Sequence, residues 1–131
     1  MKIEHVALLV EKPLEVVRWY EQHLGLKAVR AVGAPSYTHF LADTGGTVML
    51  ELYRNDRLPV PDYRAMDFLT LHVAFTTDRV EEERDRLLAA GATAEGAILK
   101  APNGDVVANL RDPWGLGIQV VRRGEPMLSV R

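Results

Sequence analysis

The chain has 131 residues, of which 47% are hydrophobic and 26% are charged, and its formal net charge is −2. This length suits one domain or two small modules that share a core. The near-neutral charge gives no support for binding to nucleic acid or to an anionic membrane surface. The chain has no cysteine, which excludes disulfides, thiolate nucleophiles and sulfur-ligated zinc.

The sequence also contains no signal for insertion into a membrane. No apolar run approaches the ~20 residues that a membrane-spanning helix needs. The N-terminal residues 1–5 include an acid and a histidine, which do not fit the apolar region of a signal peptide. We therefore expect a cytoplasmic protein with neither a membrane nor a nucleic acid as a partner.

The first half of the chain predicts the order strand, helix, strand, strand, strand. Residues 3–10 form a nearly continuous apolar run that is typical of a strand. Pro13 suits the first turn of a helix, whose apolar residues follow at helical spacing until Gly25, a common C-terminal stop. Three further strands are then expected at residues 27–32, 37–43 and 47–53.

The second half repeats this order after a polar segment. Residues 54–67 contain Pro59, Pro61 and several charges, and they predict a linker. An apolar run at 69–75 is followed by an expected helix at about 79–90 and by expected strands at 97–100, 106–111 and 116–121. The predicted boundaries are a first module at 1–53, the linker at 54–67, a second module at 68–122 and a C-terminal tail at 123–131.

Four residues with metal-binding side chains recur in register in the two halves. His5 and His72 each open a His-Val-Ala triplet, and Glu51 and Gln119 each lie in the last strand of a half. A repeat at half the chain length indicates two copies of one unit. Because side chains alternate along a strand, we expect apolar neighbours such as Val6 to pack under the helices and the four polar residues to face away. If the two sheets curve together around a pseudo-two-fold axis, these faces line one cleft.

The chain resembles the vicinal oxygen chelate superfamily over about residues 1–122. The resemblance rests on the paired units, on residues 19–25 (Trp-Tyr-Glu-Gln-His-Leu-Gly), and on the Asp-Pro-Trp-Gly turn at 112–115. Residues 19–25 are similar to the family's aromatic-Tyr-x-x-x-Leu-Gly signature. The family includes glyoxalase I, extradiol dioxygenases, fosfomycin-resistance transferases, methylmalonyl-CoA epimerase and bleomycin-resistance proteins. We expect an α+β fold of two tandem βαβββ modules with pseudo-two-fold symmetry, whose curved mixed sheets enclose a cleft.

The resemblance implies metal ligands on the first and last strands of each unit, where His5, Glu51, His72 and Gln119 lie. Two imidazoles, one carboxylate and one amide oxygen suit a divalent ion such as Zn, Ni, Fe, Co or Mn. The family's final-strand ligand is most often Glu, and this chain has Gln119 instead. The amide makes the site one charge more positive and cannot act as a base, which leaves Glu51 as the candidate base.

Each candidate residue also has a structural alternative. A lone histidine on a strand is more often held by a structural hydrogen bond, and Glu51 could be paired with Arg30 or Arg111. Gln119 could hydrogen-bond to a neighbour or to water. Outside the ligand set, the residues with candidate roles in substrate binding are His39, Tyr53 and Trp114; solvent exposure or wall packing would equally explain them.

These residues favour a glyoxalase-like, metal-dependent lyase or isomerase that acts on a small oxygen-chelating metabolite, with Glu51 as the catalytic residue. An extradiol-type dioxygenase is an alternative, although the resemblance places that carboxylate on the final strand. A metal-free protein of the bleomycin-resistance type, which binds an antibiotic or metabolite, is a second alternative. Fosfomycin transfer is disfavoured because the chain lacks a basic cluster that would hold a phosphonate. The resemblance and the half-open sheets also predict a homodimer.

Overall fold

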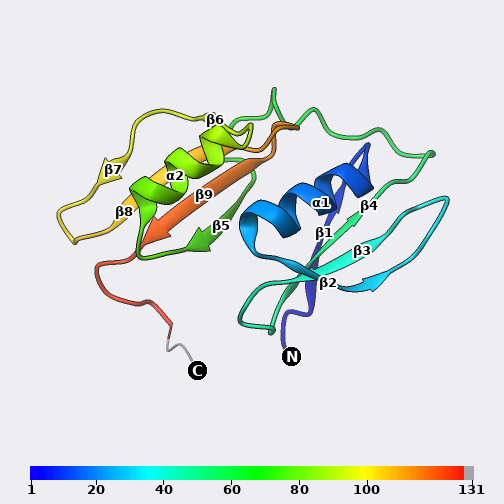
Figure 1. Ribbon diagram of the computed structural model, residues 1–131, viewed down its shortest axis with the longest axis horizontal. Helices are drawn as coiled ribbons and strands as arrows, with labels where there is room; N and C mark the ends of the chain where they lie inside the picture. Colours follow the sequence, from blue (N-terminus) through cyan, green and yellow to red (C-terminus); the bar gives the residue numbers. More distant parts are fainter. Residues whose placement is uncertain (129–131) are drawn as a thin grey trace. The chain divides into compact units, whose positions relative to one another are not determined.

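The computed structural model describes residues 1–128 and divides into two compact units (Figure 1). Unit 1 is Met1–Pro61, and unit 2 begins at Asp62. The division thus falls inside the segment that the sequence predicts as a linker. Residues 129–131 of the predicted tail lie outside the described residues.

Unit 1 consists of one helix and a four-stranded mixed sheet. Its strands have the order β1-β4-β3-β2, in which β1 is parallel to β4 and the remaining pairs are antiparallel. This is the βαβββ order that the sequence predicts. The elements are β1 (His5–Leu9), α1 (Pro13–Leu24), β2 (Lys27–Ala31), β3 (His39–Ala42) and β4 (Met49–Tyr53).

Unit 2 repeats this plan with one additional short strand. The order is β5-β9-β8-β6, with β5 parallel to β9 and β7 paired to β8. The sequence did not indicate β6, because two residues are too few to show a strand period. The predicted α+β class with two βαβββ modules is confirmed. The elements are β5 (His72–Thr76), α2 (Val80–Ala89), β6 (Thr93–Ala94), β7 (Leu99–Lys100), β8 (Val106–Arg111) and β9 (Gly117–Arg122).

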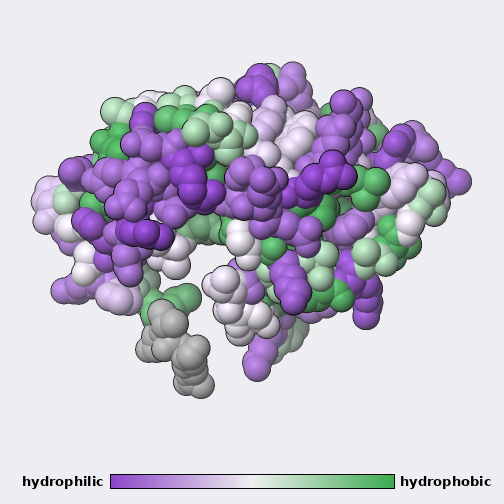
Figure 2. Space-filling model, viewed as in Figure 1, coloured by the Kyte–Doolittle hydropathy of each residue, from purple (hydrophilic) through white to green (hydrophobic). Residues whose placement is uncertain are grey.

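Each helix covers one face of the sheet in its own unit. In unit 1 the side chains of Tyr20 and Leu41 are almost completely buried, and in unit 2 the same holds for Leu87 and Ile118. Full burial of such a side chain contributes about 1.5–3 kcal/mol. The outward side of α2 is hydrophilic (Figure 2). Within residues 1–128, neither helix has the length and apolar character needed to cross a membrane.

The prediction that Val6 packs under the helix is wrong. Val6 is 47% exposed, whereas Leu8 in the same strand is 4% exposed. β1 is at the edge of its sheet with a neighbouring strand on one side only, and Val6 stays exposed near the start of this strand, although it points to the same side as Leu8. Local alternation predicts which way a side chain points, but burial also depends on what covers that side.

Residues 62–68, here called the strap, cross close to the turn at 112–115. Gly115 has a φ of +98°, and a Cβ at this position would lie 2.7 Å from the backbone nitrogen of Arg64. Asp112 is 1% exposed and accepts hydrogen bonds from the backbone N–H groups of Trp114 and Leu116, both at 2.9 Å. The turn is therefore shaped by its own carboxylate, and its glycine lets the strap approach.

Replacement of Gly115 by alanine should destabilise unit 2 more than the same replacement at Gly96. Both glycines have positive φ, +98° and +78°, where an alanine costs about 1–2 kcal/mol. Nothing lies within 4 Å of an added methyl group at Gly96, whereas at Gly115 it would meet Arg64. We expect Gly115→Ala to lose at least about 2 kcal/mol more than Gly96→Ala in urea unfolding. Equal losses would mean that the strap moves away freely.

Candidate functional site

Three of the polar residues singled out in unit 1, namely His5, Glu51 and Tyr53, lie on the sheet face that α1 does not cover. Along β4, Leu50 and Leu52 are buried, and Glu51 and Tyr53 alternate with them and are half-buried. The Nε2 atom of His5 lies 3.1 Å from Oε2 of Glu51. This face therefore brings together the two predicted ligands of unit 1.

Two carboxylates flank the imidazole of His5. Its Nδ1 donates to Oε2 of Glu4, and its Nε2 faces Glu51. The hydrogen bond to Glu4 is the main reason that the pKa of His5 is raised above its ordinary value; the charges of both carboxylates add to it, and desolvation opposes it. The arginines considered as alternative partners of Glu51 are engaged elsewhere, Arg30 over an aromatic ring and Arg111 with another carboxylate.

Phe40 is a neighbour of this pair that the sequence did not indicate. It pairs with Glu51 across β3 and β4, and its ring makes an edge contact with His5 at a centroid distance of 5.3 Å. His39 instead pairs with Leu52, which places it on the helix-covered face, and its Nδ1 donates to a backbone carbonyl at 2.7 Å. The strand at 37–43 was recognisable, but only the pairing with β4 decides which of its residues share the face of Glu51.

Unit 2 presents its two predicted ligands in the same register as unit 1. In unit 1, His5 pairs with the residue two positions before Glu51. In unit 2, His72 pairs with Gly117, which is two positions before Gln119. The internal repeat seen in the sequence is thus also a repeat in strand pairing.

The ring of His72 is fixed by Phe68, the last residue of the strap. The Nδ1 atom of His72 lies 3.1 Å from the carbonyl oxygen of Phe68. Because a carbonyl only accepts, this contact favours the proton of the neutral ring on Nδ1, which leaves the lone pair on Nε2. The Phe68 ring also stacks on the imidazole, with centroids 4.7 Å apart and an interplanar angle of 7°.

The donor chemistry of these residues fits a divalent metal ion. Metal-ligating histidines usually donate their second N–H to a carboxylate or a backbone carbonyl, and both His5 and His72 do so. Two ligand atoms at about 2.1 Å from one ion and at right angles lie about 3 Å apart, and the His5–Glu51 separation is 3.1 Å. Gln119 donates its amide nitrogen to Asn109 at 3.1 Å, which leaves the amide oxygen to act as a ligand.

Each unit by itself supplies two of the four predicted ligands. Across residues 1–128, no three or more His, Asp or Glu side chains are grouped so that they could hold a metal ion. Of the other candidates, Tyr53 shares the face of Glu51, and Trp114 lies half-buried in the turn before β9. One pocket of about 410 Å³ lies beside Asp105 and Arg123 and another of about 290 Å³ beside Arg54, and none of the four predicted ligands lines either of them.

The model of a known protein family, described as the Glyoxalase/Bleomycin resistance protein/Dioxygenase superfamily, matches residues 2–120. None of the curated protein sequences compared with the chain matches it significantly.

Three solved structures have a fold similar to that of this chain. A glyoxalase family protein from Bacillus cereus superposes with a TM-score of 0.79 at 18% identity over 94% of each chain. A single-residue variant of glyoxalase I from Zea mays gives 0.74 at 20% identity, over 95% of this chain and 46% of that one. A lactoylglutathione lyase from Agrobacterium tumefaciens gives 0.65 at 24% identity over 91% of each chain. At these identities the likeness shows the fold.

Replacement of Glu4 by glutamine should lower the pKa of His5. In the wild-type protein this pKa should lie above the ordinary value of about 6.5, because Glu4 first and Glu51 second stabilise the protonated ring. Glutamine can still accept the hydrogen bond from Nδ1, but it carries no charge. An NMR titration of the metal-free protein measures the change, with Glu11→Gln as the control because Glu11 is not among the groups that shift this pKa. An unchanged His5 pKa in E4Q would contradict the assignment.

Proposed function

Because the chain belongs to the glyoxalase/bleomycin resistance protein/dioxygenase superfamily, we propose that it is a glyoxalase-like, metal-dependent lyase or isomerase acting on a small oxygen-chelating metabolite. The observation that carries this proposal is the matched register of the two pairs, of which His5 and Glu51 already stand at ligand separation. We assign His5, Glu51, His72 and Gln119 as ligands of one divalent ion, chosen from Zn, Ni, Fe, Co and Mn. Similar structures named glyoxalase I and lactoylglutathione lyase support this reaction class.

The proposed chemistry divides between the ion and one carboxylate. A bound divalent ion supplies Lewis acidity to a substrate carbonyl oxygen, which makes the neighbouring C–H group more acidic. Glu51 takes that proton and returns it at the adjacent carbon, because Gln119 cannot accept a proton. The Nε2 atom of His5 lies 3.1 Å from the Glu51 carboxylate and holds it in place. The Phe40 ring in turn contacts the His5 ring. Tyr53 lies further along the same face of β4 and would contact the substrate.

A metal-free binding protein is the second candidate function. It is favoured by one observation, that Gln119 places an amide where the equivalent register position of unit 1 has the carboxylate of Glu51. An amide is a weaker ligand than a carboxylate, so this residue weakens binding of a divalent ion. In that case the same face would bind an antibiotic or metabolite without catalysing a reaction.

We also propose that the protein is a cytoplasmic homodimer. The support is the edge strand β1, where Val6 is half exposed and the preceding Ile3 is largely exposed. Exposed apolar side chains at a sheet edge are commonly covered by a partner. Sedimentation equilibrium at micromolar concentration measures the mass, and a monomer there would refute the dimer.

Untagged wild-type protein should contain a near-stoichiometric transition metal, and His72→Ala should lose most of it. The reason is that His72 supplies one of only two nitrogen ligands. Plasma mass spectrometry measures the metal content. His23→Ala is the matched control, because His23 lies at the end of α1 and contacts Trp19. A wild-type protein that takes up no metal after incubation with Ni, Zn, Mn or Fe(II) would overturn the metalloenzyme and favour the binding protein.

Glu51→Gln should lower kcat on α-hydroxy carbonyl substrates by about 10²–10⁴-fold, the usual contribution of a general base. The double variant E51Q/Q119E restores the total ligand charge and serves as the control for metal binding. If the double variant binds metal like the wild type but stays slow, the loss in E51Q belongs to the base and not to the ion. Unchanged turnover in E51Q with metal bound would refute the base role. Oxygen uptake by the Fe(II)-loaded protein on catechols would instead indicate a dioxygenase.

A further inference from the structure

His72, Gly117 and Arg111 lie side by side across β5, β9 and β8. Residues paired across neighbouring strands share a face of the sheet, so His72 and Arg111 project to the same side with a glycine between them. A Cβ at Gly117 would lie 3.0 Å from Cδ2 of Phe68 and 3.0 Å from Cβ of His72. The Phe68 ring therefore occupies the space that a side chain at Gly117 would need.

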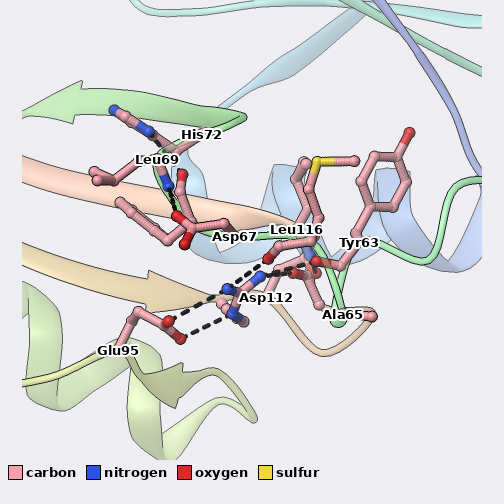
Figure 3. Close-up of polar contacts among 12 residues, drawn as sticks. Tyr63, Ala65, Asp67, Leu69, His72, Glu95, Asp112 and Leu116 are labelled. Atoms are coloured by element: carbon pink, nitrogen blue, oxygen red, sulfur yellow. Dashed lines mark hydrogen bonds and ion pairs between the residues drawn. The ribbon is translucent and has the colours of Figure 1, made fainter.

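Arg111 is 8% exposed and fastens the strap to the sheet. The dashed lines beside Glu95 and Tyr63 in Figure 3 mark hydrogen bonds of this cluster. Its Nη1 donates to the carbonyl oxygens of Tyr63 at 2.8 Å and Gly115 at 3.1 Å, and its Nη2 donates to the carbonyl of Met66 at 2.9 Å. Its Nε and Nη2 also donate to the two carboxylate oxygens of Glu95, at 2.8 and 3.2 Å. Only a planar guanidinium has enough donors in fixed directions for these contacts.

The strap ends in a turn that leads directly to His72. The Asp67 side chain accepts from the backbone N–H of Leu69 at 2.8 Å, and the Asp67 carbonyl accepts from that of Thr70 at 3.0 Å. Phe68, between these anchors, provides both the carbonyl that accepts from His72 and the ring that stacks on it. The last carbonyl held by Arg111, that of Met66, is two residues before Phe68.

We propose that Phe68 and Arg111 are positioning residues for His72. Phe68 holds the proton on Nδ1 and the ring in one orientation, so that Nε2 presents its lone pair as a ligand. Arg111 acts through the strap, because it fixes the backbone that carries Phe68. This inference rests on the proposed role of His72 as a metal ligand. A free neutral imidazole exchanges its proton between the two nitrogens, and the strap selects the tautomer with the proton on Nδ1.

The first measurement is the tautomer of His72 in the metal-free protein, from long-range ¹H–¹⁵N correlations at about pH 8.5, about two units above the ordinary pKa of histidine. We expect the proton on Nδ1 in the wild type. Phe68→Leu keeps the backbone carbonyl but removes the stacking ring. Arg111→Lys keeps the charge but removes the planar guanidinium group. Both variants should give a mixture of tautomers. Arg123→Lys is the matched control, because Arg123 is also bound to a carboxylate of unit 2, Asp105 at 2.7 Å.

The second measurement is the affinity of the same proteins for Zn(II) and Co(II) by titration. Loss of a group that orients a ligand typically weakens metal binding 10–100-fold, and we expect a loss of about this size in Phe68→Leu and Arg111→Lys and none in Arg123→Lys. A His72 that keeps its proton on Nδ1 in both test variants overturns the proposal, even if metal binding weakens. A wild type that binds no metal refutes the proposed function, while the tautomer measurement still decides the positioning role.

If a test variant does not fold, a milder substitution takes its place in the experiment. If Arg111→Lys does not fold, Glu95→Gln replaces it, since it removes the carboxylate charge that aligns the guanidinium and so weakens the hold of Arg111 on the strap. Glu95 is partly exposed, so this change is tolerable. A mixed tautomer in E95Q and F68L supports the proposal, and a wild-type tautomer in both overturns it.

Discussion

The buried guanidinium of Arg111 is the constraint on which the surroundings of His72 depend. A buried charge is costly unless its hydrogen-bonding capacity is filled, and here three backbone carbonyls and the carboxylate of Glu95 fill it. Two of those carbonyls belong to the strap. The arginine therefore needs the strap in place as much as the strap needs the arginine, and such mutual requirements favour one path of the chain over its alternatives. Lowering of the pKa of Glu95, chiefly by the hydrogen bond from Arg111, reflects the same pairing.

The two units hold their histidines by different means. In unit 1 the acceptor for Nδ1 is the carboxylate of Glu4, the residue directly before His5, and it brings a negative charge. In unit 2 the acceptor is a neutral carbonyl, which is placed by an arginine from a distant part of the sequence. Negative charge around the proposed ligands is thus concentrated in unit 1, at Glu4 and Glu51, whereas unit 2 offers an amide. This asymmetry agrees with the assignment of the base to unit 1.

The alternation and order of residues along the sequence predicted the features of this fold that depend on residues close together in the chain. The alternation around Glu51 fixed the face of that side chain, and the repeated order of elements was enough for two βαβββ modules. The choice between His39 and Phe40 depended on how β3 pairs with β4, which is a property of two segments together. Residues 62–67 of the strap were predicted as part of the linker at 54–67, because that segment contains Pro59, Pro61 and several charges. The packing of the strap depends on a hydrogen bond between Arg111 and Tyr63, 48 residues apart, and a single sequence contains no signal for that contact.

His5 and His72 each stand at the start of a strand that forms the edge of its sheet, β1 in unit 1 and β5 in unit 2. An edge strand has an open row of backbone groups, so any chain that pairs with it also restrains the histidine it carries. If such pairing strengthens binding of the proposed ion, binding of the ion strengthens the pairing by the same factor. The affinity for the ion would accordingly rise with the concentration of whatever chain adds to that edge, and a single dissociation constant would describe the protein only at a stated concentration.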